Sequence, residues 1–371
     1  MEPHSKRHKP IHQTEEFCFT EDYKRCYVFP NFKQPREVAH CSVNGPHASK
    51  TAETNRCIGR PPTKRRTLAT KTTLHKKVIS VPKELSRVNF DLNIGFGDQV
   101  PKEDKDEHLD ILLQCIRQHR IEPKDIVCYR GLLTKIAAVP YEGGRFDDGW
   151  IISAQKKGTS VYLCEFKTPS AIEKSASTTQ RQELMSYWGH KFETFVTKSS
   201  EGTGLATKPS LDLNEEFVSI VKGQIGETTL LFAGEIDCHH QDDSSKYIEL
   251  KTTRQIDHSG QDRSFKKFKL LKWWLQSFLI GIEDILCGYR DDDGIVHTLE
   301  WYKVSKIPRM SAEHWQPSVC FQYLDKFLQF VREIVTDSDR IYTFTRRPGK
   351  TNVVVDKKAP DTFEFLPEWF V

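Results

Sequence analysis

The stretch that decides the fold is residues 231–253, which read LFAGEIDCHHQDDSSKYIELKTT. An apolar run ends in Glu235 and Asp237, a polar and turn-rich stretch follows, and a second apolar run leads into Glu249 and Lys251. Because strand side chains alternate between faces, the members of each charged pair lie on the same face of their strand. The pattern predicts a hairpin on which three carboxylates and one lysine converge.

A charged hairpin face is either a solvated surface or a metal site, and the neighbouring residues favour the metal site. Leu231, Phe232 and Ile248 are strongly apolar, so both strands are expected in the middle of a sheet. Carboxylates pressed together there repel one another unless a cation lies among them. Oxygen ligands suit Mg²⁺ or Mn²⁺. Asp followed by Glu-x-Lys also resembles the core of the restriction-endonuclease-like nucleases, whose metal activates a water.

A helix predicted over residues 182–197 adds a further candidate ligand. Met185, Gly189 and Glu193 fall at i, i+4 and i+8, so they share one face. Glu193 on this face is interpreted either as a fourth carboxylate of the metal site or as an exposed helix residue. Glycine is unfavourable in the middle of a helix, and Gly189 is therefore expected to allow the close approach of another backbone.

A second helix is predicted over residues 266–280. Phe268 and Leu271 belong to the apolar face that is expected to point inward. Lys269, Lys272 and Gln276 form a polar stripe on the opposite face. Such a stripe suits a phosphate backbone, and a solvated face is the alternative interpretation.

Composition excludes several classes of protein. The 371 residues are 37% hydrophobic and carry a net charge of +4, which is typical of a globular chain and excludes a histone-like polycation. No apolar run is long enough for a transmembrane helix, and the first residues carry no secretory signal. The ten cysteines include no Cys-x-x-Cys pair, so reduced thiols are expected, without a zinc site or a disulfide framework.

The order of predicted strands and helices indicates an α+β fold, with one large domain around central mixed sheets that are flanked by helices. Residues 1–26 are expected to be poorly ordered, 27–43 to form a strand packed on the core, 44–78 to be a basic flexible insertion, and 79–371 to form the catalytic domain. Residues 45–80 hold nine Lys or Arg and one acid. This insertion is interpreted as a nuclear import signal around residues 60–66, a loose RNA-binding arm or a solvated loop.

Five motifs in order, with two further stretches near the C-terminus, resemble the DXO family of decapping exoribonucleases. The stretches are Tyr129-Arg130-Gly-Leu-Leu-Thr-Lys-Ile, Gly189-His-Lys-Phe-Glu193, Gly234-Glu235-Ile-Asp237, Glu249-Leu-Lys251, Lys269-Leu-Leu-Lys-Trp-Trp-Leu-Gln276, Trp315-Gln-Pro-Ser-Val and Phe365-Leu-Pro-Glu-Trp. The resemblance runs from about residue 78 to 371, with a weaker piece at 29–43. His190 departs from the family pattern, which prefers an apolar or aromatic residue, and little effect on chemistry is expected.

The resemblance implies a role for each matching residue. The metal ligands would be Glu193, Glu235, Asp237 and Glu249, together with the backbone carbonyl of Leu250. The resemblance implies two divalent ions, Mg²⁺ or Mn²⁺. Lys251, Gln276 and Glu235 would take part in catalysis. The residues in contact with substrate would be Arg130, Lys251, Gln276 and Glu193. Of these, Arg130 would contact the RNA backbone or the 5′ phosphate, because its guanidinium fork suits a phosphate.

The implied activity is metal-dependent hydrolysis at RNA 5′ ends. It would remove NAD caps, unmethylated caps and 5′-triphosphates, and it would degrade 5′-monophosphate RNA in the 5′→3′ direction. A large nuclear 5′→3′ exonuclease is a further implied partner. This chain itself is expected to be a monomer without membrane association. It is expected in the nucleus, and a cytoplasmic location stays open. Two alternatives stay open: a DNA nuclease with the same core, and a scaffold that binds RNA or an exonuclease without cutting.

Overall fold

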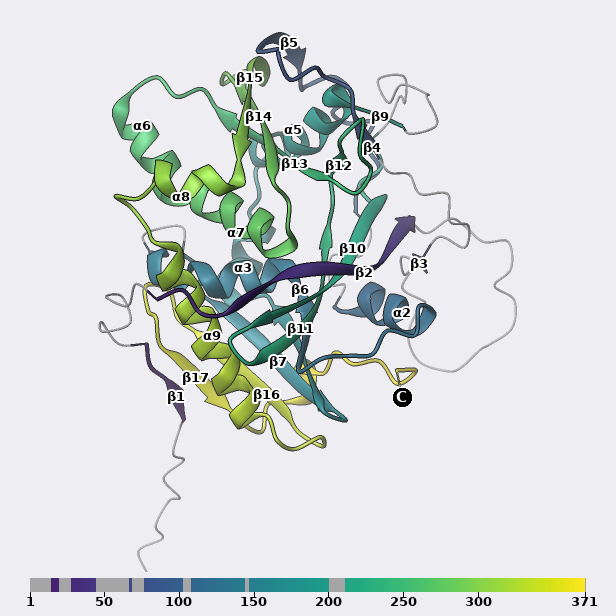
Figure 1. The fold of residues 1–371 in the computed structure, drawn as a ribbon, viewed down its shortest axis with the longest axis vertical. Coiled ribbons are helices and arrows are strands. Elements are labelled where there is room, and N and C mark those ends of the chain that lie inside the picture. Colours follow the sequence, from purple (N-terminus) through teal and green to yellow (C-terminus); the bar gives the residue numbers. More distant parts are fainter. Residues whose placement is uncertain are drawn as a thin grey trace, which may run out of the picture.

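The computed structural model describes residues 15–19, 28–44, 67–68, 77–102, 108–143, 147–199 and 211–370, and these residues form two β-sheets with helices between and around them (Figure 1). The ten-stranded sheet contains, in order across it, β1 (Glu16–Phe17), β17 (Val353–Asp356), β16 (Ile341–Arg346), β7 (Trp150–Lys157), β8 (Ser160–Phe166), β6 (Ile126–Tyr129), β11 (Thr228–Glu235), β10 (Glu216–Ile225), β2 (Phe32–Asn44) and β3 (Thr67–Leu68). The seven-stranded sheet contains β5 (Arg87–Asp91), β15 (Ile295–Lys303), β14 (Asp284–Arg290), β13 (Tyr247–Arg254), β12 (Cys238–His239), β4 (Lys77–Ile79) and β9 (Thr197–Ser199).

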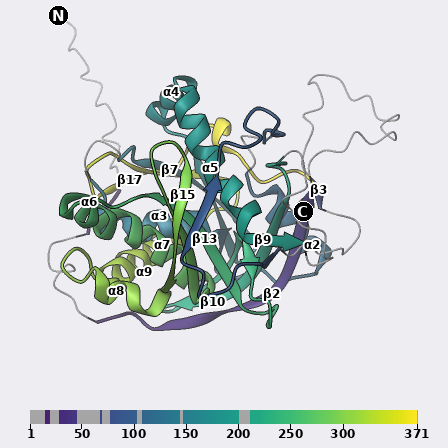
Figure 2. The ribbon, with the colours of Figure 1, turned by 90° about the horizontal axis from the view of Figure 1, so that it is seen from above.

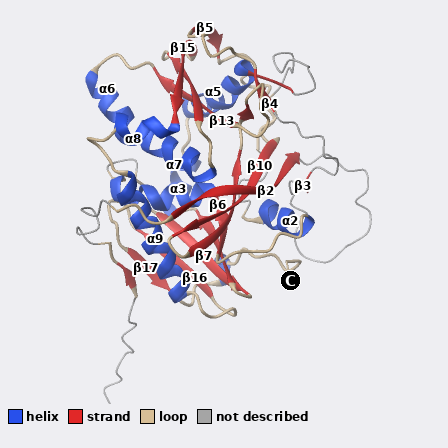
Figure 3. Ribbon diagram, viewed as in Figure 1, coloured by secondary structure: helices blue, strands red, loops and turns tan. Residues whose placement is uncertain are grey.

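The helices divide into a central layer and two outer coverings (Figure 3). The main α-helices are α2 (Asp110–Gln118), α3 (Arg130–Ala138), α4 (Pro169–Ala176), α5 (Gln180–Val196), α6 (Ser259–Ser264), α7 (Leu270–Ile280), α8 (Ile307–Met310) and α9 (Pro317–Ile334). Helices α3, α7 and α9 share one large buried cluster with apolar side chains from both sheets. Helix α2 covers the other face of the ten-stranded sheet, and α5 runs alongside β13 on the outer face of the seven-stranded sheet (Figure 2). This arrangement confirms the predicted α+β class.

Both sheets are mixed, and this decides where strand ends meet. Strand β6 runs parallel to β8 and to β11, and β13 runs parallel to β14, whereas the remaining long pairings are antiparallel. A tight turn with Gly158 at φ +59° joins the antiparallel strands β7 and β8. Within the described ranges, no helix combines the length and the apolar character that a membrane span requires.

The helix predicted over residues 266–280 differs from the observed one at its start. A π turn, Phe265–Lys269, connects α6 to α7. The wider turn adds a residue to the helical period and changes the phase of the side chains. Phe268 was expected to point inward and is instead 40% exposed, while Leu271 is buried as expected.

The N-terminal part of the chain joins both sheets. Strand β2 pairs with β10 from Phe32↔Ile225 to Val43↔Glu216, and the short β4 belongs to the other sheet. Of the basic insertion predicted at 44–78, the described residues are 44, 67–68 and 77–78. The cluster at 60–66 lies outside the described residues, as do residues 1–14 and 20–26 of the N-terminal segment predicted at 1–26.

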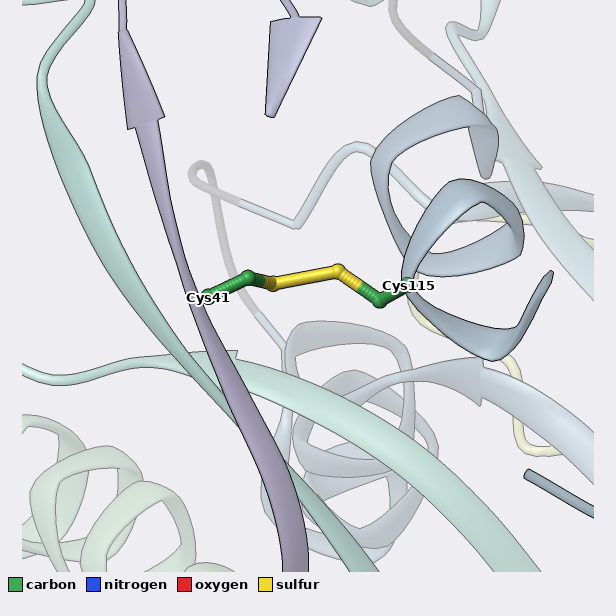
Figure 4. Close-up of a disulfide and its surroundings, with 2 residues drawn as sticks. All are labelled: Cys41 and Cys115. Carbon is green, nitrogen blue, oxygen red and sulfur yellow. A yellow bond between two sulfur atoms is a disulfide. The ribbon is translucent and has the colours of Figure 1, made fainter. Parts of the chain in front are cut away.

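Two cysteines contradict the expectation that all thiols are reduced. Cys41 of β2 and Cys115 of α2 form a disulfide across a sequence separation of 74 residues (Figure 4). Both are buried in the cluster between α2 and the ten-stranded sheet. Spacing along the chain gave no indication of this pair because the fold, and not a local motif, brings the two residues together.

Candidate active site

The site forms where the chain passes from one sheet to the other. Glu235 is the last residue of β11 in the ten-stranded sheet, and β12 begins in the seven-stranded sheet at Cys238. The antiparallel hairpin is therefore β12–β13, with Cys238 opposite Ile248. The prediction of one hairpin that carries all four charged residues is wrong, because Glu235 ends a strand of the other sheet. The acids meet at the junction of the two sheets.

Strand β13 supplies a buried carboxylate between two cations. Glu249 is 2% exposed, and its Oε1 accepts a hydrogen bond from Lys251 Nζ at 2.5 Å. Its Oε2 accepts one from Arg130 Nη1 at 3.2 Å. Asp237 contacts the same strand, because its Oδ2 accepts a hydrogen bond from the backbone N–H of Leu250 at 2.6 Å. Leu250 thus contributes its amide to the site, in addition to the carbonyl considered from the sequence.

Arg130 reaches Glu249 across a glycine. It is the first residue of α3, directly after β6, and it is 8% exposed. A Cβ at Gly234 would lie 3.1 Å from Arg130 Cδ and 2.7 Å from Ile280 Cδ1. A side chain at position 234 would therefore displace both residues. The sequence predicted that Arg130 contacts substrate, whereas in this structure the guanidinium holds a carboxylate of the site.

Glu193 comes from α5 and is paired with a lysine that the sequence analysis had placed in the basic insertion. Lys77 Nζ donates a hydrogen bond to Glu193 Oε2 at 2.6 Å. Lys77 belongs to β4, which pairs in parallel with β12 and antiparallel with β9. Strand β12 follows Asp237 and β9 follows α5, so β4 lies between the two segments that carry acids. The assignment of residue 77 to a flexible insertion is wrong.

The charges of the cluster divide the carboxylates into two kinds. Burial would raise the pKa of Glu193, but the charge of Lys77 and the nearby His190 outweigh it and hold this pKa at about 2. Burial would also raise the pKa of Glu249, but the positive charges of Lys251 and Arg130 outweigh it and lower this pKa. Both groups are anionic at neutral pH.

The other two carboxylates, Glu235 and Asp237, have raised pKa values because burial and repulsion from neighbouring acids are not balanced by nearby cations. Burial, followed by repulsion from Glu249 and Glu193, raises the pKa of Asp237 well above its usual value. The side chain of Glu235 is exposed at the rim, yet desolvation and the like charges of Glu216 and Glu193 raise its pKa to about 7. Acids that repel one another in this way fit a divalent cation, which would relieve the repulsion.

Three of the four carboxylates bind partners from the protein itself. Among the described residues, no three Asp, Glu, His or Cys side chains are set for metal binding. Instead Glu193 binds Lys77, Asp237 binds the Leu250 amide, and Glu249 binds Lys251. The donor set of hard carboxylate oxygens fits Mg²⁺ or Mn²⁺, provided that these side chains turn from their present partners.

Gln276 lies on the face of α7 that runs past the site. Ile280, one turn further along, packs against Gly234 next to Glu235. Lys269, two turns before Gln276, donates a hydrogen bond to Thr253 Oγ1 at 2.7 Å. Lys269 and Ile280 are seven and four residues from Gln276, so all three share one face of the helix. Gln276 therefore lies between the contact of Lys269 with β13 and the contact of Ile280 with β11. This places its half-buried amide toward the junction.

One expectation for α5 needs correction, and one contact was not anticipated. His190, for which little effect on chemistry was expected, has its Nδ1 3.7 Å from Glu193 Oε1. The interaction with the nearby carboxylate of Glu193 raises the pKa of His190. Gly189 was expected to admit another backbone, whereas a Cβ built there meets no atom within 4 Å. The space beside Gly189 is open, on the helix face that also carries Glu193.

The sequence missed Lys77 and Glu216 as members of the site. Glu216 begins β10 and interacts with Glu235 through its charge. Its carboxylate pairs with Lys102 at 2.7 Å. Lys77 could not be distinguished in the sequence from the eight other basic residues around it. Glu216 could not be distinguished from any other acid at the start of a strand. No spacing signal could have found either, since both depend on strand pairing.

Comparison with known proteins gives the same family throughout the chain. The model of the RAI1 like PD-(D/E)XK nuclease family matches residues 33–371. The decapping and exoribonuclease protein of Homo sapiens is 35% identical over 305 residues, which is 76% of each chain. Among solved structures, Candida albicans Rai1 in complex with pU5-Mn²⁺ has a TM-score of 0.76 at 19% identity, with 95% of each chain covered. Scheffersomyces stipitis Rai1 in complex with (3′-NADP)⁺ and calcium ion has a TM-score of 0.73 at 22% identity and covers 90% of this chain and 91% of its own.

Proposed function

The chain belongs to the RAI1-like PD-(D/E)XK nuclease family, and on that premise we propose that it is a metal-dependent hydrolase of RNA 5′ ends. It removes NAD caps, unmethylated caps and 5′-triphosphates, and it degrades the resulting 5′-monophosphate RNA in the 5′→3′ direction. The homologue named decapping and exoribonuclease protein, at 35% identity, supports both activities. The solved relatives that hold pU5 with Mn²⁺ and 3′-NADP with calcium support the substrates and a divalent ion.

One observation carries the proposal: Glu193, Asp237 and Glu249 meet beside Lys251 at the junction of the sheets, and charge repulsion raises the pKa of Asp237. We assign Glu193, Asp237 and Glu249 as ligands of the ion. A bound divalent ion supplies a polarised phosphate and an activated water. Two Mg²⁺ or Mn²⁺ ions suit the number of carboxylates, with Glu235 and the Leu250 carbonyl as further ligands.

The protein's own groups complete the chemistry. Lys251 Nζ lies beside Glu249. Burial lowers the pKa of Lys251, but the charges of Glu249 and Asp237 outweigh it and raise this pKa, so Lys251 is a cation at neutral pH. A fixed cation lowers the energy of the charge that develops on the attacked phosphate. Gln276 is assigned to orient the water or the phosphate. Arg130 is assigned to hold Glu249, and it would contact the 5′ phosphate if that carboxylate served as a metal ligand.

A single site accounts for several reactions because each of them hydrolyses a phosphate ester or anhydride. The position of the RNA relative to Asp237 and Lys251 then decides which bond is cut. The partner is an RNA 5′ end, and a large nuclear 5′→3′ exonuclease is a second proposed partner. The basic residues 60–66 support a nuclear location, and the monomeric state is proposed as the simplest arrangement for a site built within one chain.

The test uses four RNAs of one sequence, which carry a 5′-NAD, a 5′-triphosphate, an unmethylated cap or a 5′-monophosphate. Each is incubated with wild type and with the Glu235→Ala/Asp237→Ala variant, in Mg²⁺ or in EDTA, and products are resolved by mass. We expect metal-dependent loss of the 5′ group with wild type and none with the variant. Folded wild type that binds metal but converts none of the RNAs would overturn the proposal in favour of a DNA nuclease or a scaffold.

A further inference from the structure

A pocket of about 540 Å³ opens next to the carboxylate site, on the side where β13 continues beyond Lys251. One wall is formed by residues 252–256 of that strand and its exit. The other wall is the bend made by α6, the π turn and the start of α7. The side chains that matter here are Arg254, Ile256, Phe268, Lys269, Lys272 and Trp273. None of the four carboxylates lines this pocket, so it is a separate space that adjoins the site.

The π turn places an aromatic ring at the pocket. Phe268 lies within the turn and is 40% exposed, although the surrounding helix pattern assigns it to the buried face. π turns are uncommon and are found frequently at functional sites. Lys267 Nζ lies 5.0 Å from the centre of the Phe268 ring. A solvated aromatic face beside a cation suits a flat ring with a phosphate attached to it.

Lysines line the pocket together with Phe268, and the two acids that line it are paired with cations. Lys272 Nζ lies 3.3 Å from Glu142 Oε1, and the lysine side chain is 57% exposed. The buried Arg346 holds both acids of the pocket, with Nη2 at 3.0 Å from Glu142 Oε2 and Nη1 at 3.0 Å from Asp147 Oδ2. Arg254 is paired with Asp292 at 2.6 Å, so the positive charge that the pocket presents to a ligand comes from Lys269 and Lys272.

The pocket is connected directly to the reactive groups. Lys269 donates a hydrogen bond to Thr253 Oγ1 at 2.7 Å. Thr253 is two residues beyond Lys251 on the same strand, a distance of roughly 7 Å along it. Gln276 lies on the same helix face as Lys269. A chain of phosphates that begins at Lys251 thus has its next cations at Lys269 and Lys272.

We propose that this pocket binds the nucleotide of the RNA chain that adjoins the scissile phosphate, with its base stacked on Phe268 and its phosphate held by Lys269 and Lys272. The inference rests on the proposed function, because it assigns a position to the substrate of that site. The stacking contact is independent of base identity, since every base offers a π face. The pocket is therefore expected to bind the RNA chain without sequence preference.

The first experiment replaces the ring. Phe268→Ala is compared with wild type and with Met310→Ala, a control whose side chain is 42% exposed on α8 and outside the pocket. Binding of 5′-monophosphorylated oligouridylates of two and five nucleotides is measured in EDTA, and turnover is measured in Mg²⁺. We expect Phe268→Ala to weaken binding and raise KM by about 5- to 100-fold. We expect kcat to stay unchanged, Phe268→Trp to restore binding, and Met310→Ala to behave as wild type.

The second experiment removes one charge. Lys272→Gln is expected to lower the slope of log K against log salt by about 0.7, the value for one phosphate contact on a single strand. Lys246→Gln is the control, because this lysine is 64% exposed, paired with Asp243 and outside the pocket. An unchanged slope for Lys272→Gln would contradict the phosphate contact.

The outcomes separate this inference from the proposed function. Wild type that binds RNA in a Phe268-dependent manner but cuts nothing would remove the proposed function and leave the pocket. Wild type that cuts RNA with unchanged KM in Phe268→Ala would remove the pocket and leave the function. A loss confined to NAD-capped RNA, with 5′-monophosphate RNA unaffected, would show that the pocket holds the cap nucleoside and would overturn the assignment to the RNA chain.

Discussion

Lys77 Nζ lies 2.6 Å from Oε2 of Glu193, although the two residues are 116 positions apart in the sequence. The contact joins the N-terminal part of the chain to the acids of the site. Strand β4 holds Lys77 in place by pairing with β12 and β9. Burial lowers the pKa of Lys77, but the negative charges of Glu193, Glu235 and Asp237 outweigh it and raise this pKa, so Lys77 is a cation among them.

Replacing Lys77 tests whether this cation takes part in activity. Lys77→Met is expected to lower kcat about 10-fold or more and to change the apparent metal affinity, because a fixed charge beside Glu193 is lost. Lys77→Arg is expected to retain more activity than Lys77→Met. Lys198→Met is the control: Lys198 pairs with Val78, so its side chain lies on the opposite face of the strands. Normal kcat and metal dependence in Lys77→Met would make the contact purely structural.

Two deletions test where the basic segment ends. Deletion of residues 46–66 is expected to leave kcat within about 2-fold, because lengthening or shortening a connection changes stability only slowly. Deletion of residues 46–79 removes β4 and is expected to abolish most of the activity. Steady-state kinetics on both proteins, with circular dichroism as a check on folding, distinguishes the two. Equal activity of the two deletion variants would show that β4 is dispensable.

Asp237→Asn is expected to remove activity and to increase stability. The amide keeps an oxygen that can accept the hydrogen bond from Leu250, but it removes a charge that Glu249 and Glu193 repel. We expect activity on every RNA to fall at least about 100-fold. In metal-free solution we expect Tm to rise by roughly 1 to 3 °C, with no further rise when Mn²⁺ is added. An active variant, or one stabilised by Mn²⁺ as the wild type is, would contradict the assignment of Asp237 as a ligand.

The stability of the metal-free protein is expected to depend on pH through Glu235. Its pKa is raised to about 7 in the folded protein, so the folded state binds a proton more tightly than the unfolded chain. The free energy of unfolding should therefore fall as pH rises from about 4.5 to 7. The lowered pKa of Glu193 acts in the opposite sense and only at pH values below about 4.5. Urea unfolding of wild type and Glu235→Gln across this range checks the sign; equal slopes for the two proteins would be inconsistent with it.

The sequence predicted the acids of the site but not how they meet. The Asp…Glu-x-Lys spacing pointed to Asp237, Glu249 and Lys251 because alternation along a strand is a local property. The assignment of Glu235 to the same hairpin failed, since the chain leaves one sheet and enters another within two residues. Lys77 could not be recognised, because its place depends on the pairing of a three-residue strand.

The helices illustrate the same limit. The 3.6-residue period located α5 to within two residues at each end, since residues 182–197 were predicted and Gln180–Val196 are observed. It failed at Phe268, because a π turn changes the phase of the side chains and no residue in the turn marks it in advance. The disulfide between Cys41 and Cys115 was also missed, since it depends on the packing of α2 against β2.

The most direct test of the central claim is the position of the metal ion. Crystals grown with Mn²⁺ and a 5′-monophosphorylated oligouridylate would be measured at the manganese absorption edge, with the Asp237→Asn variant to prevent cleavage and wild type without RNA as the reference. We predict that anomalous density in the wild type lies within about 2.5 Å of oxygens of Glu193, Asp237 and Glu249, and that it weakens in the variant. Density at Cys238-His239-His240, or none between the three carboxylates, would contradict the account.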